Sequence, residues 1–76
     1  MMMVDQVLDT KGLNCPLPIL KAKKAINALA SGHTLQVLAT DPGSVKDFAA
    51  FCRATGHQLL SSNEEGGVFN FLIKKA

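Results

Sequence analysis

The stretch Gly12-Leu13-Asn14-Cys15-Pro16-Leu17-Pro18 marks the point at which a first strand ends and a first helix begins. Proline is tolerated in the first turn of a helix, because the backbone N–H that it lacks has no helical partner there. We therefore predict that Pro16 occupies the first helical position, that Pro18 lies in the first turn and that Cys15 is the N-cap. This places a cysteine at an exposed junction between a loop and a helix.

The residues that follow predict a helix with one buried and one exposed side. Apolar side chains recur at helical spacing and define the inward side, namely Ile19, Ala22, Ala25, Ile26 and Leu29. Ser31-Gly32 closes the run. The outward side carries Leu17, Leu20, Lys21 and Lys24. Two exposed leucines rimmed by lysines, directly beside the cysteine, predict a docking patch for an acidic partner surface.

Strands are expected on both sides of this helix. Residues 4–9 alternate loosely around Val7 and predict a short strand. A second strand is predicted where Leu35, Val37 and Ala39 alternate with polar residues, and Leu38 indicates that its outward side is partly covered. Residues 41–44 break this strand, and Gly43 or Ser44 caps a second helix that ends near Gly56. The apolar stripe of that helix is Val45, Phe48, Ala49 and Cys52.

The last third of the chain predicts a hairpin. Its strands cover residues 57–61 and 68–74, and the turn-forming run 62–67 separates them. Phe69, Phe71 and Ile73 face one way, and residues 74–76 are expected to be a solvated end. The element order is then β-α-β-α-β-β. We predict an α+β fold, a two-layer sandwich with two helices packed on one face of a four-stranded mixed sheet, because it buries every apolar stripe.

Length and composition narrow the function further. A chain of 76 residues with a net charge of +2 forms one small domain, too small to enclose a large cofactor cavity. It has no Trp or Tyr and only four Phe, so a platform for stacking nucleic-acid bases is hard to build. The opening Met1-Met2-Met3-Val4 meets Asp5 at once, which predicts neither a signal peptide nor a membrane span. We expect a cytoplasmic protein with reduced thiols.

Cys15 is the candidate reactive group. A thiol reacts as its thiolate, which the unpaired N–H groups and the dipole of a helix N-terminus stabilise. The segment 10–40 holds four lysines, Lys11, Lys21, Lys23 and Lys24, but no acidic residue, so we expect them to surround the cysteine with positive charge. Both effects predict a lowered pKa for the Cys15 thiol. Cys52, by contrast, completes an apolar helix face and is interpreted as a core residue.

Several other chemistries fit the sequence poorly. Cys15 has no second thiol at C-x-x-C spacing, and the two Cys and two His residues show no zinc-site pairing, so no metal is expected. His33 and His57 stand at predicted turns and are interpreted as solvated. Asp41 and Asp47 are assigned to the turn and to the first turn of the second helix rather than to acid–base chemistry. A lone activated thiol on a small rigid body remains.

The sequence resembles the TusA (SirA-like) sulfur-carrier family. The resemblance rests on Gly-Leu-x-Cys-Pro-x-Pro at residues 12–18, on Lys23-Lys24-Ala25, on Asp41-Pro42 and on Phe51-Cys52, and it runs from about residue 8 to 74. It implies one carrier domain over residues 1–76, with the fold predicted above.

The resemblance also implies roles for particular residues. Cys15 would accept sulfane sulfur as a persulfide from a cysteine desulfurase and pass it to a downstream acceptor protein. Gly12, Leu13, Pro16 and Pro18 would shape the turn that bears the cysteine, and Lys21, Lys23 and Lys24 would face the partner with Leu17 and Leu20. No cofactor is implied beyond the transient persulfide, so the chain would be a carrier rather than a catalyst. In one branch of the family the sulfur ends in 2-thiouridine of tRNA; others serve sulfur oxidation, molybdenum-cofactor synthesis or selenium metabolism.

Two other classes of function stay open at this stage. Small α+β sandwiches also occur among RNA-binding modules, although the weak net charge and the lack of stacking aromatics argue against direct nucleic-acid binding. A redox-regulatory domain, in which Cys15 forms a sulfenic acid or a mixed disulfide, is the other alternative.

Overall fold

The computed structural model describes residues 4–76, and its elements follow the predicted order. They are β1 (Gln6–Thr10), α1 (Leu17–Asn27), β2 (Thr34–Ala39), α2 (Ser44–Thr55), β3 (Gln58–Glu65) and β4 (Val68–Lys74). The interpretation of Met1–Met3 lies outside the described residues. No helix within residues 4–76 is long and apolar enough to span a membrane.

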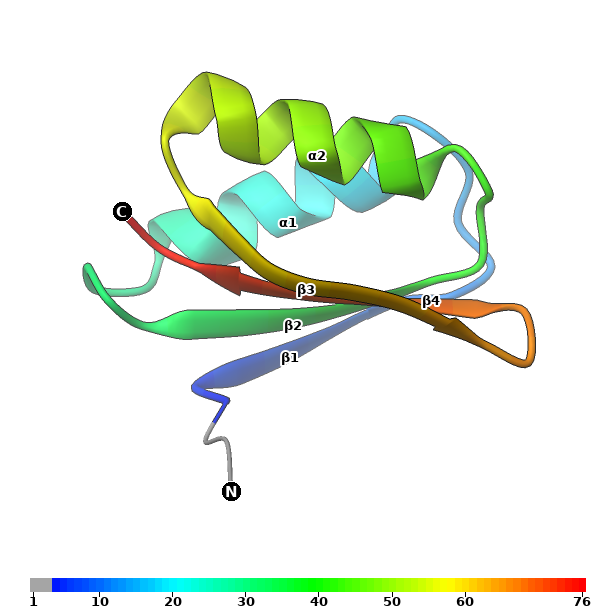
Figure 1. Cartoon of the computed structure of the whole chain (residues 1–76), viewed down its shortest axis with the longest axis horizontal. Helices are drawn as coiled ribbons and strands as arrows, with labels where there is room; N and C mark the ends of the chain where they lie inside the picture. The colour runs from blue at the N-terminus through cyan, green and yellow to red at the C-terminus, as the bar shows by residue number, and fades with distance from the viewer. Residues whose placement is uncertain (1–3) are drawn as a thin grey trace.

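The four strands form one mixed sheet in the order β1-β2-β4-β3. β1 runs parallel to β2, and β4 is antiparallel to both of its neighbours, β2 and β3. Both helices lie on the same face of this sheet, as Figure 1 shows. The predicted α+β two-layer sandwich is therefore confirmed.

The core lies between the helices and the sheet. Ala22 and Ile26 of α1 are fully buried, as the predicted inward stripe requires, and Ile19, Ala25 and Leu29 pack around them. The sheet contributes alternate residues of β2 and β4, namely Leu35, Val37, Ala39, Phe71 and Ile73. The rings of Phe48 and Phe71 stack with centroids 4.7 Å apart, which joins α2 to the centre of the sheet.

The inward face of α2 is rotated from the predicted one. Phe48 and Cys52 are buried as expected, but Val45 is 41 % exposed and Ala49 is also exposed. Ser44 is buried and Phe51 packs against the core instead. Phe51 is bulkier than Val45, so burying its ring turns the helix toward it.

Strand boundaries also differ from the prediction. β1 begins at Gln6 rather than at residue 4; Val7 is 55 % exposed, while Thr10 is buried. β3 extends to Glu65, because Ser62 to Glu65 pair with β4, and that pairing outweighs their turn propensity. The turn is reduced to Gly66 and Gly67, whose positive φ angles of 58° and 83° suit a two-residue hairpin loop.

The far ends of α1 and β4 are joined. α1 ends at Asn27, earlier than the predicted stop at Ser31-Gly32. The prediction of a wholly solvated C-terminal end is also wrong, because Lys75 is half-buried and its Nζ donates to the carbonyls of Asn27, the last residue of α1, and of Leu29. A cation at a helix C-terminus satisfies carbonyl groups that have no partner within the helix.

Candidate functional site

Cys15 lies in the loop between β1 and α1, and its side chain is exposed. The predicted N-cap role is wrong by one residue: Pro16 is the N-cap, α1 begins at Leu17, and no side chain caps the helix. The peptide bond between Cys15 and Pro16 is cis. Because α1 begins at Leu17, Cys15 lies in the loop before the helix.

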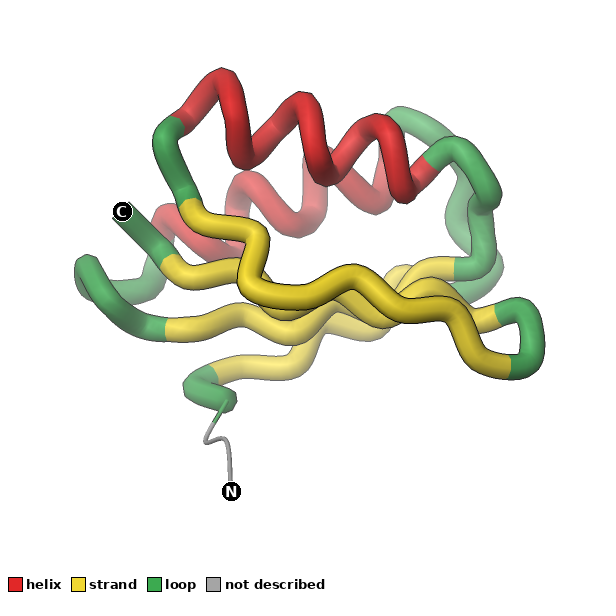
Figure 2. Tube along the Cα trace, in the orientation of Figure 1, coloured by secondary structure: helices red, strands yellow, loops and turns green. Residues whose placement is uncertain are grey.

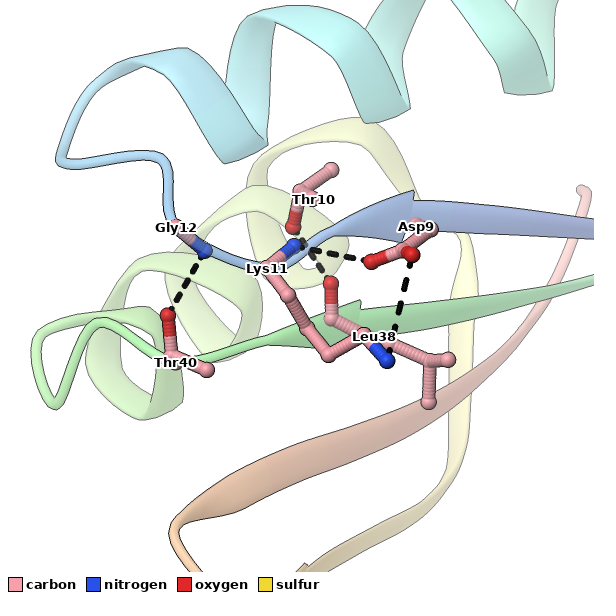
Figure 3. A network of polar contacts seen from close by, with 6 residues as sticks. All are labelled: Asp9, Thr10, Lys11, Gly12, Leu38 and Thr40. Carbon is pink, nitrogen blue, oxygen red and sulfur yellow. Dashed lines mark hydrogen bonds and ion pairs between the residues drawn. The ribbon is translucent and has the colours of Figure 1, made fainter.

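The loop that bears Cys15 is bonded to the loop that follows β2. The N–H of Gly12 donates to Thr40 Oγ1 at 2.9 Å, as Figure 3 shows. The N–H of Cys15 donates to Asp41 Oδ2 at 2.8 Å. Gly12 adopts a φ of +84°, which residues with a side chain rarely reach. These bonds fix the backbone of the cysteine, whereas its side chain is exposed.

Asp41 links three segments of the site. Its second carboxylate oxygen, Oδ1, accepts a bond from the N–H of Gly43 at 3.1 Å, and its carbonyl accepts one from the N–H of Ser44 at 3.0 Å. The same residue thus closes the turn before α2 and holds the cysteine loop against it. Asp41 serves the turn, as predicted, but also positions Cys15, which the sequence analysis missed.

A shallow hollow adjoins the cysteine, between the first turns of α1 and α2. It has a volume of about 350 Å³ and is lined by Cys15, Pro16, Ile19, Asp47, Ala50 and Phe51. Of these six, Asp47 alone is charged. A larger hollow of about 560 Å³ beside the β3–β4 hairpin is lined by polar residues and Val68 and holds no nucleophile. We therefore take the hollow at Cys15 as the functional one.

The pKa of the Cys15 thiol is shifted in the direction opposite to the prediction. A hydrogen bond to the Asp47 side chain raises the pKa of the Cys15 thiol, and desolvation and the charges of Asp47 and Asp41 raise it further. The start of α1 offers few donors to oppose this effect. Pro18 has no N–H, and the N–H of Leu17 already donates to the carbonyl of Asn14. The predicted lowering of the pKa is therefore wrong.

The expectation that lysines surround the cysteine is wrong for two of the four, Lys21 and Lys24. Lys21 and Lys24 line a different hollow, on the side of α1 that faces β1, together with Gln6 and Leu8. The acidic residues that segment 10–40 lacks come instead from the next loop and helix, as Asp41 and Asp47. The outward direction of Leu17 and Leu20 is confirmed, since they are 45 % and 55 % exposed.

The remaining candidates do not line the hollow at Cys15. Cys52 is a core residue, as predicted, and is 5 % exposed. His57 Nδ1 accepts a bond from the N–H of Ala76, at the end of the chain. All four Phe side chains are in the core or packed against it, which leaves them poorly placed to stack on bases. Within residues 4–76, no group of His, Cys, Asp or Glu is arranged to hold a metal ion.

The residues that the sequence analysis missed share one origin. Thr40, Asp41 and Asp47 follow β2, whereas Cys15 follows β1. The two strands are parallel, so the segments that leave their carboxyl ends emerge at the same edge of the sheet, as Figure 2 shows. The predicted order β-α-β is typical of parallel strands, so it already indicated that the segments after the two strands meet.

Comparison with known proteins identifies the family. The family described as Sulfurtransferase TusA matches residues 6–75. The Sulfur carrier protein TusA of Allochromatium vinosum is 67 % identical over 72 residues, which cover 95 % of each chain. The Sulfur carrier protein TusA of Pseudomonas putida is 44 % identical over 71 residues, 93 % of this chain and 89 % of that one.

A solved structure shares the fold. The crystal structure of the SirA-like protein from Desulfitobacterium hafniense superposes with a TM-score of 0.82 at 27 % sequence identity. The match covers 91 % of this chain and 95 % of that chain.

Proposed function

The chain belongs to the TusA family, and we propose on that basis that it is a sulfur carrier that holds its cargo as a persulfide on Cys15. The observation that carries this proposal is the exposed thiol of Cys15 on a loop whose backbone is held by Thr40 and Asp41. An exposed thiol on a fixed loop can enter the active site of another protein without a pocket of its own.

The transfer needs only the thiol and a donor persulfide. Cys15 Sγ, as thiolate, attacks the outer sulfur of a persulfide on a cysteine desulfurase, and the sulfur–sulfur bond of the donor breaks. Its electron pair stays on the donor cysteine, which takes up the proton released by Cys15. The transferred sulfur keeps its oxidation state, so no cofactor takes part. We place this exchange in the cytoplasm, where reducing conditions keep Cys15 free.

The exposed start of α1 is the proposed docking surface. Leu17 and Leu20 present apolar side chains one turn beyond the cysteine. Lys21, Lys23 and Lys24 are exposed on the same helix, which suits an acidic partner surface. Changing Leu20 to Asp should weaken the complex with the donor enzyme, measured by calorimetry, while changing the distant Leu60 to Asp should not.

Mass spectrometry tests the role of Cys15. The protein is incubated with cysteine and a cysteine desulfurase, and its peptides are examined for one added sulfur. We expect the sulfur on the Cys15 peptide, its loss in Cys15→Ser and its retention in Cys52→Ser. Sulfur that stays in Cys15→Ser, or disappears in a folded Cys52→Ser, would contradict the proposal.

We propose 2-thiouridine in tRNA as the destination of the sulfur, since this is its fate in the best-known branch of the family; the sequence signature is common to all the branches. Deleting the gene should remove 2-thiouridine from tRNA, and the wild-type gene, but not Cys15→Ser, should restore it. Unchanged 2-thiouridine would direct the search to sulfur oxidation, molybdenum-cofactor synthesis or selenium metabolism.

A further inference from the structure

We infer that Asp47 is a charge gate on Cys15: its carboxylate lines the same hollow as the thiol and opposes formation of the thiolate in the free protein, and a partner favours the thiolate by placing a cationic side chain against Asp47. This inference rests on the proposed function, because it concerns how the carrier cysteine becomes reactive. It adds a positioning residue to the site, and it assigns a positive charge to the partner surface that covers the hollow.

Asp47 and Asp41 differ in their contacts and therefore in their roles. Both oxygens of Asp41 accept backbone N–H groups, those of Cys15 and Gly43, so this carboxylate has a structural task. Asp47 lies in the first turn of α2, half-buried, and lines the same hollow as Cys15. Its carboxylate is thus the charged group best placed to act on the sulfur.

None of the described cationic side chains forms an ion pair with this carboxylate. Within residues 4–76 the one ion pair joins Lys11 to Asp9. Lys21 and Lys24 face the β1 side of α1, away from the hollow. The negative charges of Asp47 and Asp41 therefore act on the thiol without compensation, and the pKa of Cys15 is raised. A protonated thiol is a poor nucleophile and is slow to be oxidised, which protects a carrier between encounters.

Docking supplies the compensating charge. An opposite charge within a few ångströms of Asp47 would offset its effect on the thiol and favour the thiolate. The S–H proton is then released to the donor cysteine as the donor's sulfur–sulfur bond breaks, in the exchange written above. The docking surface would be divided in charge: basic along α1, where Lys21 and Lys24 lie, and acidic at the hollow, where Asp47 lies. A complementary partner surface would be acidic where it meets α1 and basic where it meets the hollow.

Alkylation of the free protein tests the first half of the inference without any sulfur transfer. The rate of Cys15 modification by iodoacetamide is measured from pH 6 to 10 in wild type, Asp47→Asn, Asp47→Glu and the control Glu64→Gln, which removes an equal charge from the exposed hairpin strand. We expect Asp47→Asn to move the rate profile to lower pH and to raise the rate at pH 7 several-fold. Asp47→Glu should stay closer to wild type, and Glu64→Gln should match it. An unmoved profile in Asp47→Asn, or an equal shift in Glu64→Gln, would overturn the gate.

Sulfur loading tests the second half. If the partner relieves the gate, Asp47→Asn should alkylate faster than wild type, yet take sulfur from the desulfurase no faster. A loading rate that rises by the same factor as alkylation would show that the partner supplies no compensating charge, and would overturn that half. If wild type takes up no sulfur at all, the proposed function fails, while the alkylation profiles still decide whether Asp47 restrains the thiol.

Discussion

Cys15 and Cys52 are the same residue in opposite surroundings. Cys15 is exposed on a loop, and Cys52 is 5 % exposed within the core. The pKa of both thiols is raised: at Cys15 mainly by Asp47, with desolvation and the charge of Asp41 adding to it, and at Cys52 by burial alone. A partner protein can cancel the first effect with a charge, whereas only unfolding removes the second. The proposed carrier thiol, Cys15, is therefore distinguished from Cys52 by its exposure and by the nearby carboxylates that raise its pKa.

The largest expected contrast is the rate of alkylation of the two thiols in the folded protein. Cys15 should react freely, whereas Cys52 should react only through opening of the domain. A domain stable by about 5 kcal/mol would slow the modification of Cys52 by about 10³-fold or more. Peptide mass spectrometry after a timed iodoacetamide pulse measures both rates. Comparable rates would mean that the core around Cys52 opens readily.

Removing the aromatic ring of Phe48 should abolish the difference in alkylation rate between Cys15 and Cys52. Phe48 is fully buried and stacks on Phe71, so Phe48→Ala should cost about 3–5 kcal/mol of stability. Urea unfolding followed by circular dichroism measures the loss, and Cys52 should become open to alkylation. Protection of Cys52 that survives in Phe48→Ala would show that α2 is held chiefly by other contacts.

Replacing each cysteine by serine should show that the stability of the fold depends on Cys52 and not on Cys15. Cys52→Ser buries a hydroxyl among apolar side chains and should cost about 1–3 kcal/mol. Cys15→Ser alters an exposed side chain and should leave the urea midpoint unchanged. Equal destabilisation by the two variants would contradict the assignment of Cys52 to the core and Cys15 to the loop.

The pH dependence of Cys15 should reflect its carboxylate neighbours. Because its pKa is raised, the thiolate fraction at pH 7 is smaller than in an unstructured cysteine peptide. The alkylation rate should climb about tenfold for each pH unit below the pKa and level off only above it. Levelling at a lower pH than the peptide would contradict the raised pKa.

The smallest expected effect lies at the opposite end of β1. The carboxylate of Asp5 accepts a bond from the N–H of Thr34 at 2.7 Å, and this bond lowers the pKa of Asp5. A lowered pKa stabilises the fold above the unfolded-state value, and the contribution is lost as the pH falls through the folded-state value. Asp5→Asn should thus reduce the urea midpoint slightly at pH 7 and not at pH 2. A difference that persists at pH 2 would point to a cause other than the charge.

Secondary structure and the exposed position of Cys15 could be predicted because they depend on local patterns. The apolar spacing of α1 and the alternation of β2 identify buried faces within one element. The prolines around Cys15 identify a loop-to-helix junction, to within one residue. The predictions failed where a neighbouring element decided the outcome: Phe51 turned α2, and pairing with β4 extended β3 through residues with turn propensity.

The sequence by itself determined the order of elements, the two-layer fold and an exposed Cys15 beside Leu17 and Leu20. Only the tertiary structure decided the charge around that cysteine. Asp41 and Asp47 stand 26 and 32 positions away along the chain, yet parallel pairing of β1 with β2 brings their loops together. Electrostatic fields depend on distance in space, whereas composition along a segment counts only neighbours in sequence. For this reason the segment 10–40, which contains no acidic residue, places Cys15 beside two carboxylates from later in the sequence, Asp41 and Asp47.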